Sequence, residues 1–134
     1  PRAFGLSVAV MMGMVCDTAV RVCEACGVRA TSPTISGAGS RITCCLADTS
    51  PYAVMIGTRK VAGFAVRRYP ESWLIQGSLL VRPLPEALCC ALPNELRRRL
   101  EAWAVPLAAA AAEPVTETDV MARWANEQGA ETIP

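Results

Sequence analysis

Histidine is absent from this chain of 134 residues. The sequence therefore cannot assemble a Ser-His-Asp triad, a Cys-His pair or a histidine metal site from its own residues. A general base or an electrophilic group must come from lysine, a carboxylate, cysteine, tyrosine or the backbone. This short list directs attention to the few residues of those types that stand out.

Lysine is almost absent as well, because Lys60 is the only one and the other twelve of the 13 basic residues are arginines. A lysine at the start of a strand is usually a solvated surface charge. Where arginine supplies the ordinary positive charge, however, a single lysine indicates a need for a compact ammonium that a planar guanidinium does not replace. Lys60 is therefore the first candidate functional residue.

Strong charge of either sign is lacking, since the net charge is +1. The composition thus gives no reason to expect a nucleic acid or an anionic membrane as partner. No apolar run reaches the roughly 18–20 residues that span a bilayer. The stretch Ala3–Cys16 resembles a signal-peptide core, but it has no clear small-residue cleavage site. We interpret it as structural and expect a cytoplasmic protein.

The seven cysteines do not suggest a disulfide framework, because their number is odd and four of them form the adjacent pairs Cys44-Cys45 and Cys89-Cys90. A zinc site built from Cys23, Cys26 and the first of these pairs would have the right number of ligands. Cys23 and Cys26 nevertheless fall on an apolar helical stripe, where cysteine behaves as a small hydrophobic residue. We therefore expect reduced thiols and no metal.

Residues 52–81 predict a three-stranded antiparallel meander. Three runs of β-branched and large apolar residues are separated by turn residues at Gly57-Thr58 and at Tyr69-Pro70-Glu71. The middle run begins near Lys60 and contains the small pair Ala62-Gly63, where little side chain would obstruct a ligand.

The N-terminal part is expected to form a buried strand over Phe4–Val10, then a helix over Met14–Cys26 that Gly27 ends. Residues Val28–Arg41 have no hydrophobic period and predict a long loop.

The C-terminal part is expected to be helical. A short helix is predicted over Glu86–Leu92, and Asn94 is expected to cap a second helix that ends at Trp103. Its inward-facing residues are predicted to be Leu96, Leu100 and Trp103, with Arg97-Arg98-Arg99 mostly in water. Residues 104–115 are interpreted as a linker. A capping box at Thr116–Asp119 predicts a last helix that ends near Gly129 and buries Val120, Met121 and Trp124.

Cys45 and Lys60 together suggest acyl chemistry. A cysteine attacks acyl groups as the thiolate, and a nearby ammonium stabilises both that thiolate and the oxyanion that develops on the acyl carbonyl. A cysteine just upstream of one strand can meet a lysine at the start of the next. Because side chains alternate along an extended segment, only one of Cys44 and Cys45 is expected to face Lys60.

The run Arg59–Arg68 followed by Leu74–Leu80 resembles two motifs of the biotin/lipoate A/B protein ligase family. The first resembles Arg-Lys-(hydrophobic)-(Ser/Ala/Val)-Gly-Ser-Ala-Gln-Arg-Arg, and the second Leu-Gln-His-Gly-Ser-Leu-Leu. The preceding Cys45–Tyr52 is similar to the Cys-Phe…Ser-(aromatic)-Tyr segment of the octanoyltransferase branch. The resemblance extends from about Val15 to the last helix.

This resemblance implies an α+β fold with a mixed, largely antiparallel sheet flanked by helices. By position, Lys60 matches the lysine that contacts the acyl carbonyl or its adenylate, and Cys45 matches the acyl-thioester cysteine. Substrate-binding positions are implied at four further residues of the acyl-binding tunnel, which are Gly63, Gln76, Gly77 and Ser78. The sequence departs from the family pattern at Gln76, where histidine is usual, and at Phe64, where serine is usual.

The family's N-terminal half, with its glycine-rich loop and histidine, has no counterpart in this sequence. We therefore expect residues 1–134 to be a single but incomplete catalytic domain, or one member of a split pair that a second chain completes. Such a chain should not catalyse the reaction by itself.

Three functions follow from the resemblance. The first is transfer of an octanoyl or lipoyl group through a Cys45 thioester to the lysine of a lipoyl-domain protein, with an acyl carrier protein as a possible donor. The second is an ATP-dependent lipoate–protein ligase, in which Lys60 would hold the adenylate. The third is a non-catalytic partner of a split ligase. Lipoate or octanoate is expected as substrate, ATP only in the ligase, and no tightly bound cofactor in any of them.

Overall fold

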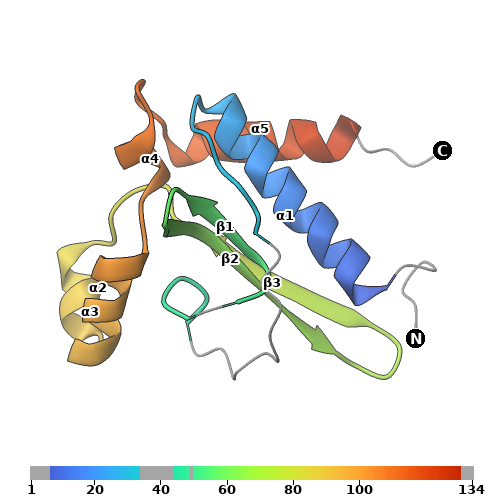
Figure 1. The fold of residues 1–134 in the computed structure, drawn as a ribbon, viewed down its shortest axis with the longest axis horizontal. Coiled ribbons are helices and arrows are strands. Elements are labelled where there is room, and N and C mark those ends of the chain that lie inside the picture. Colours follow the sequence, from blue (N-terminus) through green and yellow to red (C-terminus); the bar gives the residue numbers. More distant parts are fainter. Residues whose placement is uncertain (1–6, 34–43, 49, 131–134) are drawn as a thin grey trace.

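The computed structural model describes residues 7–33, 44–48 and 50–130, with the backbone alone for 128–130 (Figure 1). The elements in chain order are α1 (Val8–Ala25), β1 (Ala53–Ile56), β2 (Arg59–Arg68), β3 (Trp73–Leu79), α2 (Glu86–Ala91), α3 (Asn94–Trp103), α4 (Leu107–Ala110) and α5 (Glu117–Ala130).

The three strands form one antiparallel sheet in the order β1-β2-β3, so the predicted meander is confirmed. Gly57 turns the chain between β1 and β2 with a φ of 59°, a conformation that costs glycine little. Residues 34–41 of the predicted loop Val28–Arg41 lie outside the described residues. In its described part, Thr31 forms an antiparallel bridge with Met55 along the outer side of β1. The protein is therefore an α+β structure.

The first helix begins earlier than the sequence predicts. Ser7 caps α1 by accepting a hydrogen bond from the amide of Val10 at 3.3 Å, so the predicted strand Phe4–Val10 is wrong for Val8–Val10. Its first part, residues 4–6, lies outside the described residues. A short apolar run fits a buried strand and a buried helix equally well, and the serine cap decides for the helix. Gly27 follows the end of the helix with a φ of 75°, as predicted.

One face of the sheet is covered by α1 and α5, which lie together above it in Figure 1. The core between them contains fully buried Met12 and Val22 of α1 and Val54 and Val61 of the sheet. Phe64 of β2 reaches Trp124 of α5, with the ring centroids 6.3 Å apart. The predicted burial of Val120 is confirmed, Trp124 is partly buried against the same core, and Met121 is 71% exposed.

Cys23 and Cys26 are buried within this core, as expected for small apolar side chains. Among the described residues no group of three or more cysteine or carboxylate side chains could hold a metal ion. In the same part of the chain, no helix is long and apolar enough to cross a membrane.

A β-bulge decides which side chains of β2 share a face. Ala53 pairs with Gly63 and Met55 pairs with Lys60, so Val61 is one residue more than the partner strand supplies. Because of this extra residue, Lys60 and Gly63 lie on the same face of the sheet although they are three positions apart. That face is the one opposite α1.

The other face of the sheet contacts α3 and the turn formed by residues 44–48. Pro93, not Asn94, is the N-cap of α3, and Asn94 makes no capping hydrogen bond, so the predicted cap is wrong. Leu100 is buried as predicted, but Trp103 is 58% exposed and does not enter the core.

The last helix starts as predicted. The amide of Asp119 donates to Thr116 Oγ1 at 3.2 Å, and the amide of Thr116 donates to Asp119 Oδ2 at 2.9 Å, which is a capping box. The segment 104–115, expected to be a linker, carries α4 and buries Leu107 completely.

Candidate functional site

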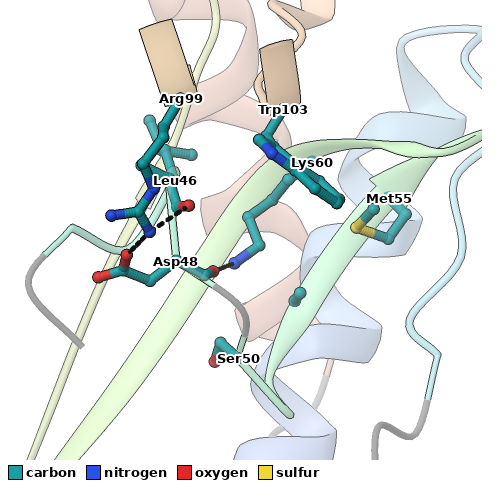
Figure 2. A pocket seen from close by; sticks show the side chains of 9 residues that line it. Leu46, Asp48, Ser50, Met55, Lys60, Arg99 and Trp103 are labelled. Carbon is teal, nitrogen blue, oxygen red and sulfur yellow. Dashed lines mark hydrogen bonds and ion pairs between the residues drawn. The ribbon is translucent and has the colours of Figure 1, made fainter. Parts of the chain in front are cut away.

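A cavity of about 260 Å³ lies on the sheet face opposite α1, between the strands, α3 and the 44–48 turn. Figure 2 shows side chains from all three parts converging on it. Its walls are formed by Leu46, Ala47, Asp48, Ser50, Ala53, Met55, Lys60, Arg99 and Trp103. Five of these nine residues are apolar, and the others supply one carboxylate, one hydroxyl, one ammonium and one guanidinium group.

Lys60 is the buried cation of this cavity, with a side chain that is 95% removed from solvent. Its Nζ donates to the main-chain carbonyl oxygens of Cys45, at 3.0 Å, and of Asp48. An ammonium carries three N–H donors, so these two bonds leave one for a ligand in the cavity. The main chain of Lys60 is also held, since its carbonyl accepts from the amide of Val105 at 2.9 Å.

Burial lowers the pKa of Lys60 below its ordinary value, and the negative potential of Cys45, then of Asp48 and Cys44, acts in the opposite direction. The lysine therefore interacts electrostatically with both thiols of the pair, and most strongly with Cys45.

The segment that carries the two cysteines is a turn, not an extended strand. The amides of Ala47 and Asp48 both donate to the carbonyl of Cys44, at 3.1 and 2.9 Å. The expectation that strand alternation separates Cys44 from Cys45 is therefore wrong for residues 44–48; residues 42 and 43 lie outside the described part. Both thiols are half-buried and reduced.

Gly63 allows this turn to lie directly on β2. A Cβ atom built at Gly63 would overlap the carbonyl oxygen of Cys45. Any larger residue would thus push the turn away from the sheet. The sequence predicts that Ala62-Gly63 leaves room for a ligand. In the structure, Gly63 instead leaves room for the main chain of Cys45.

The helix α3 brings Arg99 and Trp103 to the cavity. Its C-terminal end is fixed to the start of β2, because the guanidinium of Arg59 donates to the carbonyl of Glu101 at 3.0 Å and to that of Ala104. These are the carbonyls that a helix end leaves without helical partners. Arg99 in turn forms an ion pair with Asp48, drawn as a dashed line in Figure 2.

The other substrate-binding residues predicted from the resemblance lie away from the cavity walls described above. The β2–β3 register places Gln76 and Ser78 on the same face as Lys60, but both are exposed. Gly77 belongs to the opposite face, where an added Cβ would meet the ring of Phe64. Their roles stay predictions.

Sequence reasoning missed four polar or aromatic residues of the cavity, namely Asp48, Ser50, Arg99 and Trp103. The sequence predicts that all three arginines of the run mostly face water, which is correct for Arg98 but not for Arg99. A signal existed, since Arg99 follows Leu96 by three positions and precedes Trp103 by four, which places it beside the inward stripe of α3. No comparable signal marks Ser50, whose hydroxyl joins the amide of Tyr52 at 3.1 Å to the carbonyl of Phe64 at 3.3 Å.

Among solved structures, the fold is similar to a crystal structure of lipoate-protein ligase A bound with ATP, with a TM-score of 0.66 and 14% sequence identity. The chain has a lipoate-ligase-like fold. The superposition covers 93% of this chain and 46% of the ligase chain, so the chain spans about half the length of that protein. No protein-family model and no curated protein matches the sequence. The fold class that the sequence resemblance implied is confirmed.

Chemically, the site offers an ammonium with a free donor beside an apolar cavity. A donor of this kind can bind a carboxylate, an acyl carbonyl or an oxyanion. The apolar walls formed by Leu46, Met55 and Trp103 suit an aliphatic chain. The site is thus suited to a carboxylic acid or acyl group that carries a hydrocarbon tail.

Proposed function

We propose that this chain carries the acyl-transfer site of a protein-lipoylation enzyme. In this proposal an octanoyl or lipoyl group passes through a thioester on Cys45 to the lysine of a lipoyl-domain protein. One observation carries the proposal: Lys60, the only lysine, is buried beside an apolar cavity and binds the main chain of Cys45 in a lipoate-ligase-like fold.

The first step would be a transthioesterification. The thiolate of Cys45 attacks the carbonyl carbon of the donor thioester, and the carbon–sulfur bond to the donor breaks after a tetrahedral oxyanion has formed. The donor leaves as a thiolate, for which an acyl carrier protein is the proposed source. Lys60 stabilises the Cys45 thiolate before attack and donates its third N–H to the oxyanion.

The second step would form the amide. The neutral amine of the acceptor lysine attacks the thioester carbon, and the bond to Cys45 breaks with its electron pair kept by the sulfur. The proton that the amine loses passes to solvent water as the amide forms. The Cys45 thiolate is regenerated next to Lys60. No redox change and no external energy source are needed, because a thioester is more reactive than the amide it becomes.

An ATP-dependent lipoate–protein ligase is the second candidate, and one observation favours it. Cys45 is not among the described residues that line the cavity, whereas Lys60 is. In a ligase the acid would be activated as an acyl-adenylate, Lys60 would bind its carbonyl, and Cys45 would have no chemical role. The similar ligase structure was solved with ATP.

The experiment that separates the candidates is an acylation assay on a lipoyl domain with two alternative donors. Since residues 1–134 are expected to need a completing partner, the assay is run with that partner present. An octanoyl-carrier thioester without ATP should then acylate the domain if the transferase proposal is correct. Acylation only by free lipoate plus ATP would replace it with the ligase. Acylation that survives the replacement of both Cys45 and Lys60 in this chain would place the catalytic groups in the partner and assign this chain to the accessory class.

A further inference from the structure

Arg99 contacts the cysteine-bearing turn, whereas the arginines next to it do not. Its Nη2 donates to the carbonyl oxygen of Ala47 at 3.1 Å and pairs with Oδ1 of Asp48. Arg97 instead lies 3.9 Å from Glu101 on its own helix, and Arg98 is exposed. The three consecutive arginines therefore have different surroundings, and one of them belongs to the site.

The carboxylate of Asp48 links Arg99 to Cys44, the first residue of the turn. While Oδ1 pairs with Arg99, Oδ2 accepts the amide of Cys44 at 2.8 Å. The Asp48 side chain is only 8% exposed, and a carboxylate buried to that extent is costly without charged or hydrogen-bonding partners. Removing the guanidinium would thus remove one of the contacts that hold Asp48 and would weaken its hold on the amide of Cys44.

Two cations from different elements hold the turn from two sides. Lys60 of β2 binds the carbonyls of Cys45 and Asp48, while Arg99 of α3 binds the carbonyl of Ala47 and the Asp48 carboxylate. Figure 2 shows the two cations on either side of Asp48. The three hydrogen bonds within the turn do not connect it to the sheet. Its position on the sheet therefore depends on long-range contacts such as these.

We propose that Arg99 is a positioning residue of this site. Through Asp48 and Ala47 it holds the 44–48 turn where the main chain of Cys45 meets Lys60, and it thereby sets the geometry of acyl transfer. The catalytic consequence rests on the proposed function. The fixation of the turn does not, and it can be measured separately.

The test compares Arg99→Gln with Arg99→Lys and with the matched control Arg98→Gln, all in the whole protein. The first measurement is amide hydrogen exchange at Cys44, Ala47 and Asp48, with α1 amides as the reference. In Arg99→Gln we expect roughly ten- to hundredfold faster exchange at these three amides only, the factor typical of losing a charged hydrogen bond. Arg98→Gln should exchange like the wild type, and Arg99→Lys should recover part of the protection.

The second measurement is steady-state transfer to a lipoyl domain. For Arg99→Gln, kcat should fall roughly ten- to hundredfold while KM for the lipoyl domain stays within about twofold. A residue that only stabilised the fold would change neither parameter per folded molecule. If Arg99→Gln does not fold, Asp48→Asn removes the same ion pair with almost no change in volume and is measured in its place.

Unchanged exchange at the three amides would overturn the positioning of the turn, whatever the activity. Faster exchange with an unchanged kcat would overturn the catalytic consequence while the proposed function survives. If the wild type transfers no acyl group with either donor, the proposed function fails, and the exchange data alone decide whether Arg99 fixes the turn.

Discussion

The Nζ atom of Lys60 lies 3.0 Å from the main-chain carbonyl oxygen of Cys45. The only lysine of the chain thus fixes the main chain of the residue that we propose as the nucleophile, and a third donor of the same ammonium is available for the acyl oxyanion of the proposed reaction. One side chain can serve both purposes because an ammonium has three donors that point in different directions.

Replacing Lys60 by arginine should lower acyl transfer by roughly 10²–10³-fold, the loss typical of removing one oxyanion donor. The positive charge would remain, but a planar guanidinium cannot bind two converging carbonyls and also point a third donor into the cavity. Turnover under saturating donor is the measurement. Arg68→Lys, at the exposed end of the same strand, is the control for swapping lysine and arginine at a position outside the site. Near wild-type turnover in Lys60→Arg would refute the role of Lys60.

The stability contributed by Lys60 should depend on pH. Since burial lowers its pKa in the folded protein below the ordinary value of 10.5, the unfolded chain binds more protons in the interval between the two values. The free energy of unfolding attributable to this group therefore rises as the pH increases through the folded-state pKa. Urea unfolding at pH values that rise towards 10.5 should show a difference between wild type and Lys60→Gln that shifts in favour of the wild type. A difference that stays constant or moves the other way would contradict the burial of a charged Lys60.

Gly63 and Gly77 should respond differently to alanine. Both substitutions place a methyl group in occupied space, and each is expected to cost roughly 1–3 kcal/mol of stability. Only Gly63→Ala pushes against Cys45, so only this variant should lose kcat per folded molecule. Gly77→Ala displaces the ring of Phe64 on the opposite face and is the matched control. Equal kcat in the two variants would show that contact between the turn and β2 does not matter for transfer.

Thr116→Ala should destabilise the protein by about 1 kcal/mol without changing turnover. The hydroxyl of Thr116 accepts the amide of Asp119, and alanine would leave this first-turn donor without its partner. Thr118→Ala, two positions further on and exposed, should have little effect in the same denaturation experiment. Equal stability of the two variants would argue that the capping box does not contribute to α5.

Much of the fold could be predicted, because its signals are local. The turn residues between the strands and the Thr116–Asp119 cap each specify a conformation of the nearby backbone. The N-terminal strand prediction failed because the apolar run did not distinguish strand from helix, and the cap at Ser7 was overlooked.

The site was predicted less completely, because its geometry depends on contacts between distant residues. The position of Lys60 was recognised from its uniqueness. Its hydrogen bonds to the carbonyls of the 44–48 turn depend on a β-bulge at Val61, which no pattern in the sequence predicts. The ion pair between Arg99 and Asp48 joins residues 51 positions apart, and helical periodicity alone could not identify the carboxylate.

The central claim is that Cys45 carries the acyl group, and peptide mass spectrometry after incubation with an octanoyl-carrier donor tests it most directly. We predict a hydroxylamine-sensitive octanoyl group on Cys45 and none on Cys44, with both the adduct and the transfer lost in Cys45→Ala and retained in Cys44→Ala. The account would be contradicted by a Cys45→Ala variant that still acylates the lipoyl domain at the wild-type rate.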